Sequence, residues 1–231
     1  FPLRGKVLNV REANVKQIND NKEIVNIKKI LGLESGKTYK DLKSLRYGKI
    51  MIMTDQDHDG FHIKGLLLNM FHSMWPSLLD KDFISYMNTP IVKVWLKKDI
   101  KSFYTLTDYN QWKENTNNYK KYNIKYYKGL GTSTAKESKE YFKELKLNTY
   151  VSPEKELTDK SINLAFNKKQ ADDRKEWLKK YDENEILDYK IPETKIEDFI
   201  NKELIHFSNA DTCRSIGSCM DGLKTSQRKI L

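Results

Sequence analysis

Apolar positions along the first third of the chain follow the two periods that distinguish strands from helices. The short segment 7–10 predicts a strand, and the segment 13–31 carries apolar residues at the spacing of an amphipathic helix. The apolar run KIMIMT at 49–54 predicts a second strand that ends in a polar loop. Apolar residues then recur at helical spacing over 63–75, where a proline ends the pattern. These patterns predict strand and helix, followed by strand, acidic loop and helix.

The middle of the chain is rich in short β-type segments. Three runs predict strands at 83–87, 91–96 and 103–106. The tripeptide Asn-Thr-Pro at 88–90 separates the first two, and a Lys-Lys-Asp turn at 97–99 separates the last two. A mixed sheet with flanking helices is the simplest architecture for this order of elements.

Helical patterns dominate the second half of the chain. Thr134 and Glu137 match a capping box that opens a helix ending at Leu145. The long basic segment 159–181 predicts a second helix, and 196–207 predicts a third. We therefore expect the sheet to be followed by a largely helical region.

Composition narrows the class of protein. The chain has 231 residues, of which 38% are hydrophobic and 11% aromatic, and this excludes a disordered chain. Its formal net charge of +10 indicates a polyanionic partner. No apolar run reaches the roughly 18 residues of a membrane span, so we expect an intracellular protein without a membrane partner. The two cysteines, Cys213 and Cys219, lack a zinc-binding pattern and are expected to be free thiols.

The acidic loop, residues 55–60, carries the clearest chemistry. Its carboxylates Asp55, Asp57 and Asp59 alternate directly after a predicted strand, and such clustering favours a hard divalent cation, Mg²⁺ or Ca²⁺. A solvated acidic turn is the alternative. An EF-hand is excluded because its twelfth position, where a bidentate Glu is needed, is Leu66, and because a strand precedes the loop.

The chain resembles type IIA DNA topoisomerases in three segments that occur in the same order: PLRGKVLNV at 2–10, MTDQDHDG at 53–60 and YKGLGT at 127–132. The segment KKQADDRKEWL at 168–178 resembles the eukaryotic branch of that family. The resemblance implies a TOPRIM fold, which is an α/β fold with a Rossmann-like, mixed and largely parallel sheet flanked by helices. A helical extension and the start of a winged-helix domain would follow.

We expect three units on this basis. Residues 1–105 would form the TOPRIM core without its first strand, 106–190 its C-terminal extension, and 191–231 the truncated start of a winged-helix domain. The boundary near Pro192 rests on the proline between two predicted helices. The chain begins with Phe1, and we expect it to be a piece of a longer protein.

The resemblance also assigns the metal site. In the family, an upstream Glu-Gly-Asp-Ser-Ala motif supplies a glutamate that completes a Mg²⁺ site with the first two aspartates of the acidic loop. This chain begins after that motif. Asp55 and Asp57 are therefore the expected direct ligands, and Asp59 a supporting carboxylate. Such a metal would stabilise charge on the scissile phosphate and on the leaving 3′ oxygen.

Double-stranded DNA is the partner that the resemblance implies. Five basic residues are expected to contact its phosphates: Arg4, Lys6, Lys128, Arg214 and Lys224. Arg214 and Lys224 match positions that approach the cleaved phosphates and would support catalysis. Gly217 and Thr225 stand where the family commonly has proline, which loosens this backbone. His206, on an apolar run, is expected to be structural.

The family as a whole suggests the activity of the full-length protein. Its members break both DNA strands through tyrosyl phosphates, pass a second duplex through the break with the use of ATP, and reseal it as nuclear homodimers. We expect the nucleophilic tyrosine and the ATP-binding domain to lie outside these residues, so the fragment itself should be inactive. Two alternatives remain: a TOPRIM-containing primase or nuclease, and a non-enzymatic basic DNA-binding module.

Overall fold

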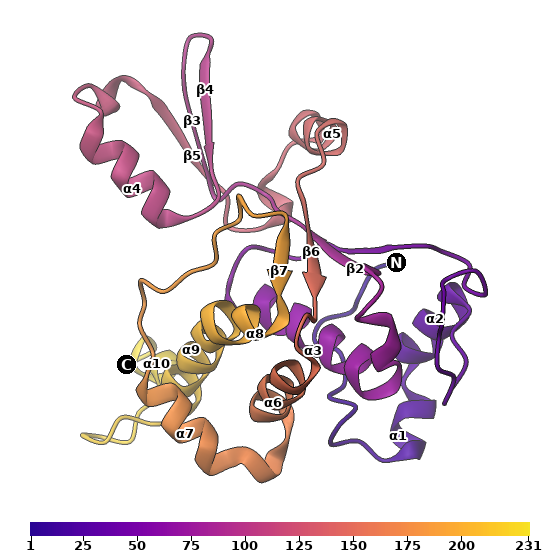
Figure 1. Cartoon of the computed structure of the whole chain (residues 1–231). Coiled ribbons are helices and arrows are strands. Elements are labelled where there is room, and N and C mark those ends of the chain that lie inside the picture. The colour runs from indigo at the N-terminus through magenta and orange to yellow at the C-terminus, as the bar shows by residue number, and fades with distance from the viewer.

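The computed structural model describes residues 1–231 and contains two sheets (Figure 1). The large sheet has the order β1-β2-β6-β7, with strands β1 (Ile50–Ile52), β2 (Ile84–Met87), β6 (Leu147–Val151) and β7 (Glu193–Lys195). β1 pairs parallel with β2 and β6 pairs parallel with β7, whereas β2 and β6 are antiparallel. The expected mixed α/β architecture is confirmed.

The second sheet is small, antiparallel and separate from the first. Its order is β4-β3-β5, with strands β3 (Val92–Leu96), β4 (Asp99–Phe103) and β5 (Asn123–Tyr126). Helix α4 (Leu106–Asn115) packs on it, and Figure 1 shows this unit projecting away from the large sheet. We call residues 91–126 the small lobe. The expectation that these strands extend the first sheet is wrong, because β3 finds both of its partners within the lobe.

Helices flank the large sheet (Figure 1). The α-helices outside the small lobe are α1 (Val15–Asp20), α2 (Lys22–Leu31), α3 (His58–Met74), α5 (Ala135–Lys143), α6 (Lys155–Phe166), α7 (Ala171–Lys179), α8 (Ile196–Phe199), α9 (Ile205–Ser215) and α10 (Thr225–Arg228). Short 3-10 turns are η1 (Pro76–Leu78), η2 (Tyr119–Lys121), η3 (Leu130–Thr132) and η4 (Lys168–Gln170), and η5 (Ile200–Leu204) is a π turn. No helix combines the length and apolar character that crossing a membrane requires.

Helix α3 is the centre of the main core. Its side chains Met70 and Phe71 are fully buried, as the apolar spacing predicts, and Leu68 is fully buried as well. Burial of one such side chain contributes about 1.5–3 kcal/mol. The helix ends before Pro76, which lacks the backbone N–H that a further helical turn needs. Because α3 begins at His58, within the acidic loop, the core fixes the position of that loop.

Two expectations for the N-terminal region are wrong. Residues 7–10 form no strand: Val7 and Val10 are buried in the core, but no neighbouring strand pairs with them. The segment 13–31 is not one helix, because Asn21 separates α1 from α2. The side-chain oxygen of Asn21 accepts a hydrogen bond from the backbone N–H of Ile24, which starts a new helix where the first one ends.

Element boundaries also differ in the second half of the chain. The expected helix 159–181 is interrupted at Asn167, whose side chain accepts from the backbone N–H of Lys169 and opens a new turn. The expected strand 103–106 is mostly absent, because Thr105 caps α4 instead. The capping box of Thr134 and Glu137 is confirmed, although α5 ends at Lys143.

Helix formation over 196–207 is confirmed, but a π turn interrupts it and the helix continues to Ser215. The two cysteines on and after this helix, Cys213 and Cys219, are exposed free thiols, as expected.

Candidate metal and DNA site

The acidic loop connects the end of β1 to the start of α3. Asp57 is the N-cap of α3: its Oδ1 atom accepts a hydrogen bond of 2.7 Å from the backbone N–H of Gly60. A carboxylate at this position is also stabilised by the helix dipole. A Cβ atom on Gly60 would overlap the carbonyl oxygen of Asp55. The tight turn therefore needs glycine, and it holds Asp57 in one orientation.

Asp55 is held by the glycine loop, residues 127–132, which lies 75 positions further along the chain. Its Oδ1 atom accepts a hydrogen bond of 2.6 Å from the backbone N–H of Leu130. A Cβ atom added to Gly129 would lie 2.6 Å from Oδ2 of Asp55, so only glycine permits this approach. Two segments that the sequence marks separately are thus in direct contact.

Asp59 joins cations from the two ends of the chain. Its carboxylate is 3.0 Å from Nζ of Lys6 and accepts hydrogen bonds of 3.0 and 3.2 Å from the guanidinium of Arg214. The hydrogen bonds from Arg214 and Lys6 lower the pKa of Asp59 to about 2. We call these three residues the Asp59 triad. The triad brings two of the predicted DNA contacts beside the acidic loop.

The other three predicted DNA contacts are exposed. Arg4 lies in the same segment as Lys6, Lys128 lies in the glycine loop, and Lys224 precedes α10. Arg4 and Lys128 make no side-chain hydrogen bond or ion pair within the chain, and Lys224 makes no ion pair. Their charges therefore remain available to an anion from outside.

The oxygen atoms of the acidic loop fit a magnesium ion with few protein ligands. Asp55 and Asp57 each use one carboxylate oxygen in a hydrogen bond to the backbone, and each keeps a second oxygen without a hydrogen bond. Asp59 is occupied by two cations, and no group of three or more His, Cys, Asp or Glu side chains could hold a metal. Mg²⁺ is commonly bound by one or two carboxylates together with water and phosphate oxygens.

Histidines near the site do not add a metal ligand set. His206 has Nδ1 3.2 Å from the hydroxyl of Tyr181 and Nε2 3.0 Å from the carbonyl oxygen of Glu185, as a structural histidine would. Burial lowers the pKa of His62 to about 4, and its ring stacks on Phe207 with centroids 3.9 Å apart. A neutral histidine at this position adds no charge beside Lys6.

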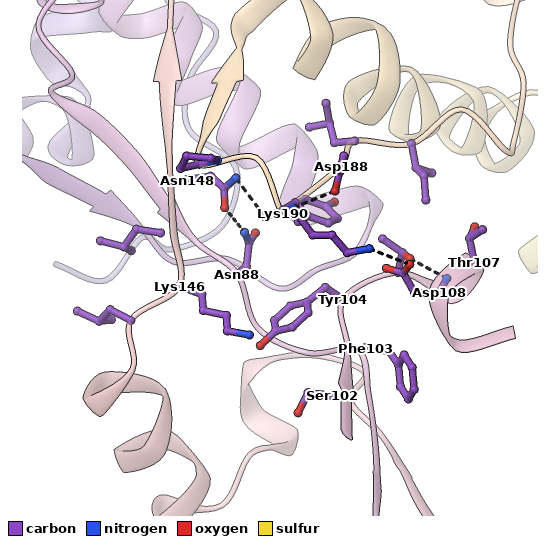
Figure 2. Close-up of a pocket in the computed structure, with 17 residues that line it drawn as sticks. Asn88, Ser102, Phe103, Tyr104, Thr107, Asp108, Lys146, Asn148, Asp188 and Lys190 are labelled. Atoms are coloured by element: carbon purple, nitrogen blue, oxygen red, sulfur yellow. Dashed lines mark hydrogen bonds and ion pairs between the residues drawn. The ribbon is translucent and has the colours of Figure 1, made fainter. Parts of the chain in front are cut away.

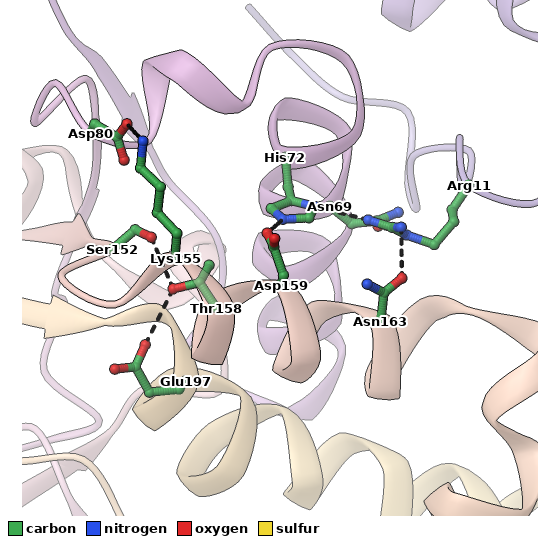
Figure 3. Close-up of polar contacts among 10 residues, drawn as sticks. All are labelled: Arg11, Asn69, His72, Asp80, Ser152, Lys155, Thr158, Asp159, Asn163 and Glu197. Atoms are coloured by element: carbon green, nitrogen blue, oxygen red, sulfur yellow. Dashed lines mark hydrogen bonds and ion pairs between the residues drawn. The ribbon is translucent and has the colours of Figure 1, made fainter.

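A polar cluster fixes the segment that carries Arg4 and Lys6 (Figure 3). Arg11 donates hydrogen bonds to Asn69 (3.0 Å) and Asn163 (2.8 Å), and its Nη2 atom lies 2.8 Å from Nδ1 of His72. Nε2 of His72 is 2.6 Å from the carboxylate of Asp159. This cluster ties the N-terminal segment to α3 and α6. Sequence reasoning missed Arg11, although it directly follows the matched segment 2–10.

Two of the larger cavities have different lining residues. A groove of about 720 Å³ is lined by Asp55, Asp57 and Asp59 together with apolar residues of the N-terminal segment and β1. A second cavity, of about 840 Å³, lies between the small lobe and the segment before β7, and Figure 2 shows Asn88, Asn148, Lys146 and Lys190 around it. None of the predicted site residues lines the second cavity.

Family profiles match nearly the whole chain. The Toprim domain matches residues 1–89, and the C-terminal associated domain of TOPRIM matches residues 87–212. The chain belongs to the TOPRIM family. The acidic loop therefore lies in the Toprim domain, and the glycine loop that holds Asp55 lies in the domain associated with it.

Relatives of this TOPRIM chain confirm the resemblance to type II topoisomerases. The chain is 55% identical to DNA topoisomerase 2-alpha of Homo sapiens, with 100% of the chain and 16% of the relative covered. It is 54% identical to DNA topoisomerase 2-beta of Gallus gallus, covering 15% of that protein. These matches over the whole chain favour type II topoisomerases over other TOPRIM proteins such as primases and nucleases.

A solved structure of a topoisomerase II domain also matches the chain. The chain superposes with a TM-score of 0.91 on the crystal structure of the Plasmodium falciparum topoisomerase II DNA-binding, cleavage and re-ligation domain. The two are 51% identical, with 100% of this chain and 32% of that chain covered. The TOPRIM chain thus spans a small part of the proteins that it matches.

Proposed function

We propose that this chain is part of the DNA cleavage and religation core of a type II DNA topoisomerase, where it supplies carboxylates for Mg²⁺ and cations for the DNA backbone. The Asp59 triad is the observation that supports this most strongly. It gathers Lys6 and Arg214 beside Asp55 and Asp57, although these residues come from three distant segments. Anionic and cationic groups in one place suit a metal and a phosphate together.

Each side chain has a definite task in this proposal. A bound Mg²⁺ would stabilise negative charge on the scissile phosphate and the leaving 3′ oxygen. The backbone N–H groups of Gly60 and Leu130 orient Asp57 and Asp55, leaving one oxygen of each carboxylate free for the metal. Two free carboxylate oxygens fit the few-ligand shell that Mg²⁺ adopts next to phosphates.

The basic residues would hold the DNA backbone. Lys6 and Arg214 share the single negative charge of Asp59 in the absence of DNA, and Arg214 also pairs with Asp211. A phosphate can take the place of the Asp59 carboxylate. Arg4, Lys128 and Lys224 are exposed and would add further phosphate contacts. Arg214 and Lys224 are the two that we assign to the cleaved phosphates.

The activity of the whole protein is also a proposal, since these residues cover 16% of the human relative. We propose an ATP-dependent, nuclear, homodimeric topoisomerase in which the nucleophilic tyrosine and the ATP-binding domain lie outside residues 1–231. Residues 191–231 would begin the winged-helix domain, 1–105 the TOPRIM core and 106–190 its extension. Residues 1–231 alone should then form no covalent adduct with DNA on a denaturing gel.

A magnesium titration followed by NMR tests the metal assignment. We expect weak binding, on the order of millimolar, with shifts at the amides of Asp55, Asp57 and Gly60. Asp55→Asn or Asp57→Asn should reduce these shifts. Asp172→Asn, on exposed helix α7, is the matched control and should leave them unchanged. Shifts that survive both loop substitutions would overturn the assignment of Asp55 and Asp57 as ligands. No shift at all in the wild type would favour a basic DNA-binding module with an inert acidic turn.

A further inference from the structure

A lysine and a glutamate are buried together beneath the acidic loop. The side chain of Lys64, on α3, is 0% exposed, and that of Glu203, in the π turn η5, is 2% exposed. Lysine and glutamate are almost never fully buried unless they are paired. Burial lowers the pKa of Lys64, and the charge of Glu203 opposes this shift. The pair is therefore held in place by specific contacts.

The contacts of the pair lead directly into the acidic loop. Nζ of Lys64 donates a hydrogen bond of 3.2 Å to the side-chain oxygen of Gln56 and lies 4.0 Å from Oε2 of Glu203. It also lies 4.4 Å from the centre of the Tyr86 ring. The hydroxyl of Tyr189 donates to the other oxygen of Glu203. Lys64 is thus the link between Glu203 and Gln56.

A chain of amide side chains continues from Gln56 across the large sheet. Gln56 donates a hydrogen bond of 3.1 Å to Asn88, Asn88 donates to Asn148, and Asn148 donates to the carbonyl oxygen of Ile191. Figure 2 shows the link between Asn88 and Asn148 at the wall of the cavity beside the small lobe. We call Gln56, Asn88 and Asn148 the amide chain. Both ends of the Gln56 amide are therefore fixed by buried partners.

Gln56 stands between the two proposed metal ligands. Asp55 is held by Leu130 and Asp57 by Gly60, so the neighbours of Gln56 on both sides have fixed orientations as well. If Gln56 lost its buried partners, its side chain could leave the interior and the backbone between the two aspartates could rotate. The geometry of the two carboxylates depends on this inward anchor.

The pair also connects the acidic loop to the helix that carries Arg214. Glu203 lies in η5, which continues directly into α9. Arg214, near the end of α9, reaches the same loop at Asp59 on the surface. A buried ion pair is weak support for stability, since apolar residues of similar volume often replace it without loss. Here the Lys64–Glu203 pair serves to orient the acidic loop relative to α9.

We propose that Lys64 and Glu203 are positioning residues, which fix Gln56 and thereby the orientation of Asp55 and Asp57 relative to the helix that carries Arg214. This inference rests on the proposed function, because it assigns the two residues to the metal site. In this assignment both residues act through Gln56 and contact neither the metal nor the DNA. Removing a contact that orients a metal ligand typically changes metal affinity by about 10–100-fold.

Apolar replacement of the whole pair tests the proposal. Lys64→Met and Glu203→Gln should each lower the melting temperature, because each leaves one partner unpaired in the interior. The double variant Lys64→Met/Glu203→Leu should recover most of that loss. It should still exchange the amide hydrogens of residues 55–57 faster than the wild type and bind Mg²⁺ about tenfold more weakly. Lys155→Met, which removes an exposed ion pair with Asp80, is the control.

Gln56→Leu gives an independent test, because it leaves the ion pair in place and removes the hydrogen bonds of Gln56 to Lys64 and Asn88. It should weaken Mg²⁺ binding by a similar factor. Wild-type exchange and Mg²⁺ affinity in both the double variant and Gln56→Leu would overturn the positioning role. Faster loop exchange in these variants, together with a wild type that shows no Mg²⁺ shift, would support the positioning and overturn the proposed function.

Discussion

The large sheet and the small lobe differ in the number of side chains that their cores bury. The core around the large sheet and α3 joins 29 buried residues, whereas the core of the small lobe consists of Val92, Val94 and Tyr109. The acidic loop belongs to the first region. The glycine loop follows β5, the last strand of the second. The hydrogen bond between Leu130 and Asp55 therefore joins a well-packed region to a sparsely packed one.

This difference suggests how the site is assembled. Asp57 is fixed at the start of α3, which belongs to the large core. Asp55 is held by the glycine loop, which follows the last strand of the small lobe. Regions with few buried apolar contacts open at lower free-energy cost than the global core. We expect Asp55 to be the more adjustable of the two carboxylates.

Replacing aromatic side chains in the two cores should have the largest effect on stability. Phe71→Ala should destabilise the whole chain by about 3–5 kcal/mol in urea unfolding, because the ring is buried between Trp75 and Phe83. Tyr109→Ala should instead accelerate amide exchange in β3, β4 and β5 while α3 stays protected. Equal loss of protection in α3 after both changes would contradict the division into two regions.

The small lobe should be sensitive to acid through Glu137. Burial raises the pKa of this carboxyl, but hydrogen bonds from Lys125, Tyr127 and Thr134 outweigh it and lower the pKa to about 2. A lowered pKa means that the contribution to stability is fully present above the ordinary value of 4.5 and is lost as the pH falls towards 2.

Glu137→Gln should remove this acid dependence, at a cost of about 1.5–3 kcal/mol at neutral pH, the range for hydrogen bonds to a charged group. Amide exchange of residues 123–132 between pH 5 and pH 2.5 measures the effect. Identical pH profiles for the variant and the wild type would show that Glu137 does not anchor the glycine loop.

Gly129 tests the contact between the two regions directly. Gly129→Ala places a Cβ atom against the carboxylate of Asp55 and should displace Leu130, which weakens Mg²⁺ binding by about tenfold. Gly131→Ala is the matched control, since nothing lies within 4 Å of a Cβ atom there. Calorimetric or NMR titration of both variants measures the difference. Equal Mg²⁺ affinities would mean that the glycine loop does not orient Asp55.

The smallest effect concerns DNA affinity at physiological salt, where screening acts over about 8 Å. Charge reversal at Arg214 and Lys224 should reduce the slope of log K against log salt by about 0.9 for each lost phosphate contact. Charge reversal at Lys97 and Lys98, in the exposed turn of the small lobe, should reduce this slope less. Equal losses from both double variants would indicate diffuse binding by a basic surface.

Local sequence patterns predicted the helices and strands whose apolar positions are regularly spaced and whose ends are marked by a proline or a polar loop. Helix α3 combines an apolar spacing with a following proline, and the strand before the acidic loop is a compact apolar run. The helix breaks at Asn21 and Asn167 were missed, because an asparagine inside a helical pattern can equally point to solvent or cap a new helix. Tertiary packing decides between the two outcomes.

The site was predictable only where its residues are adjacent in sequence or match the family. The acidic loop satisfies both conditions. Lys64 is one lysine within a helical pattern, and nothing in the sequence indicates its contact with Glu203, 139 residues away. The separate small sheet was missed for the same reason, since alternation identifies a strand but does not identify its partner.

The π turn at 200–204 has a consequence for the spacing between the two ends of the site. A π turn contains one residue more than the corresponding α-helical turn. Deleting one residue there would restore a regular helix and rotate every later side chain by about 100° around the axis. Arg214 would then face away from Asp59. The length of this segment, and not only its residue types, thus sets which side of α9 faces the loop.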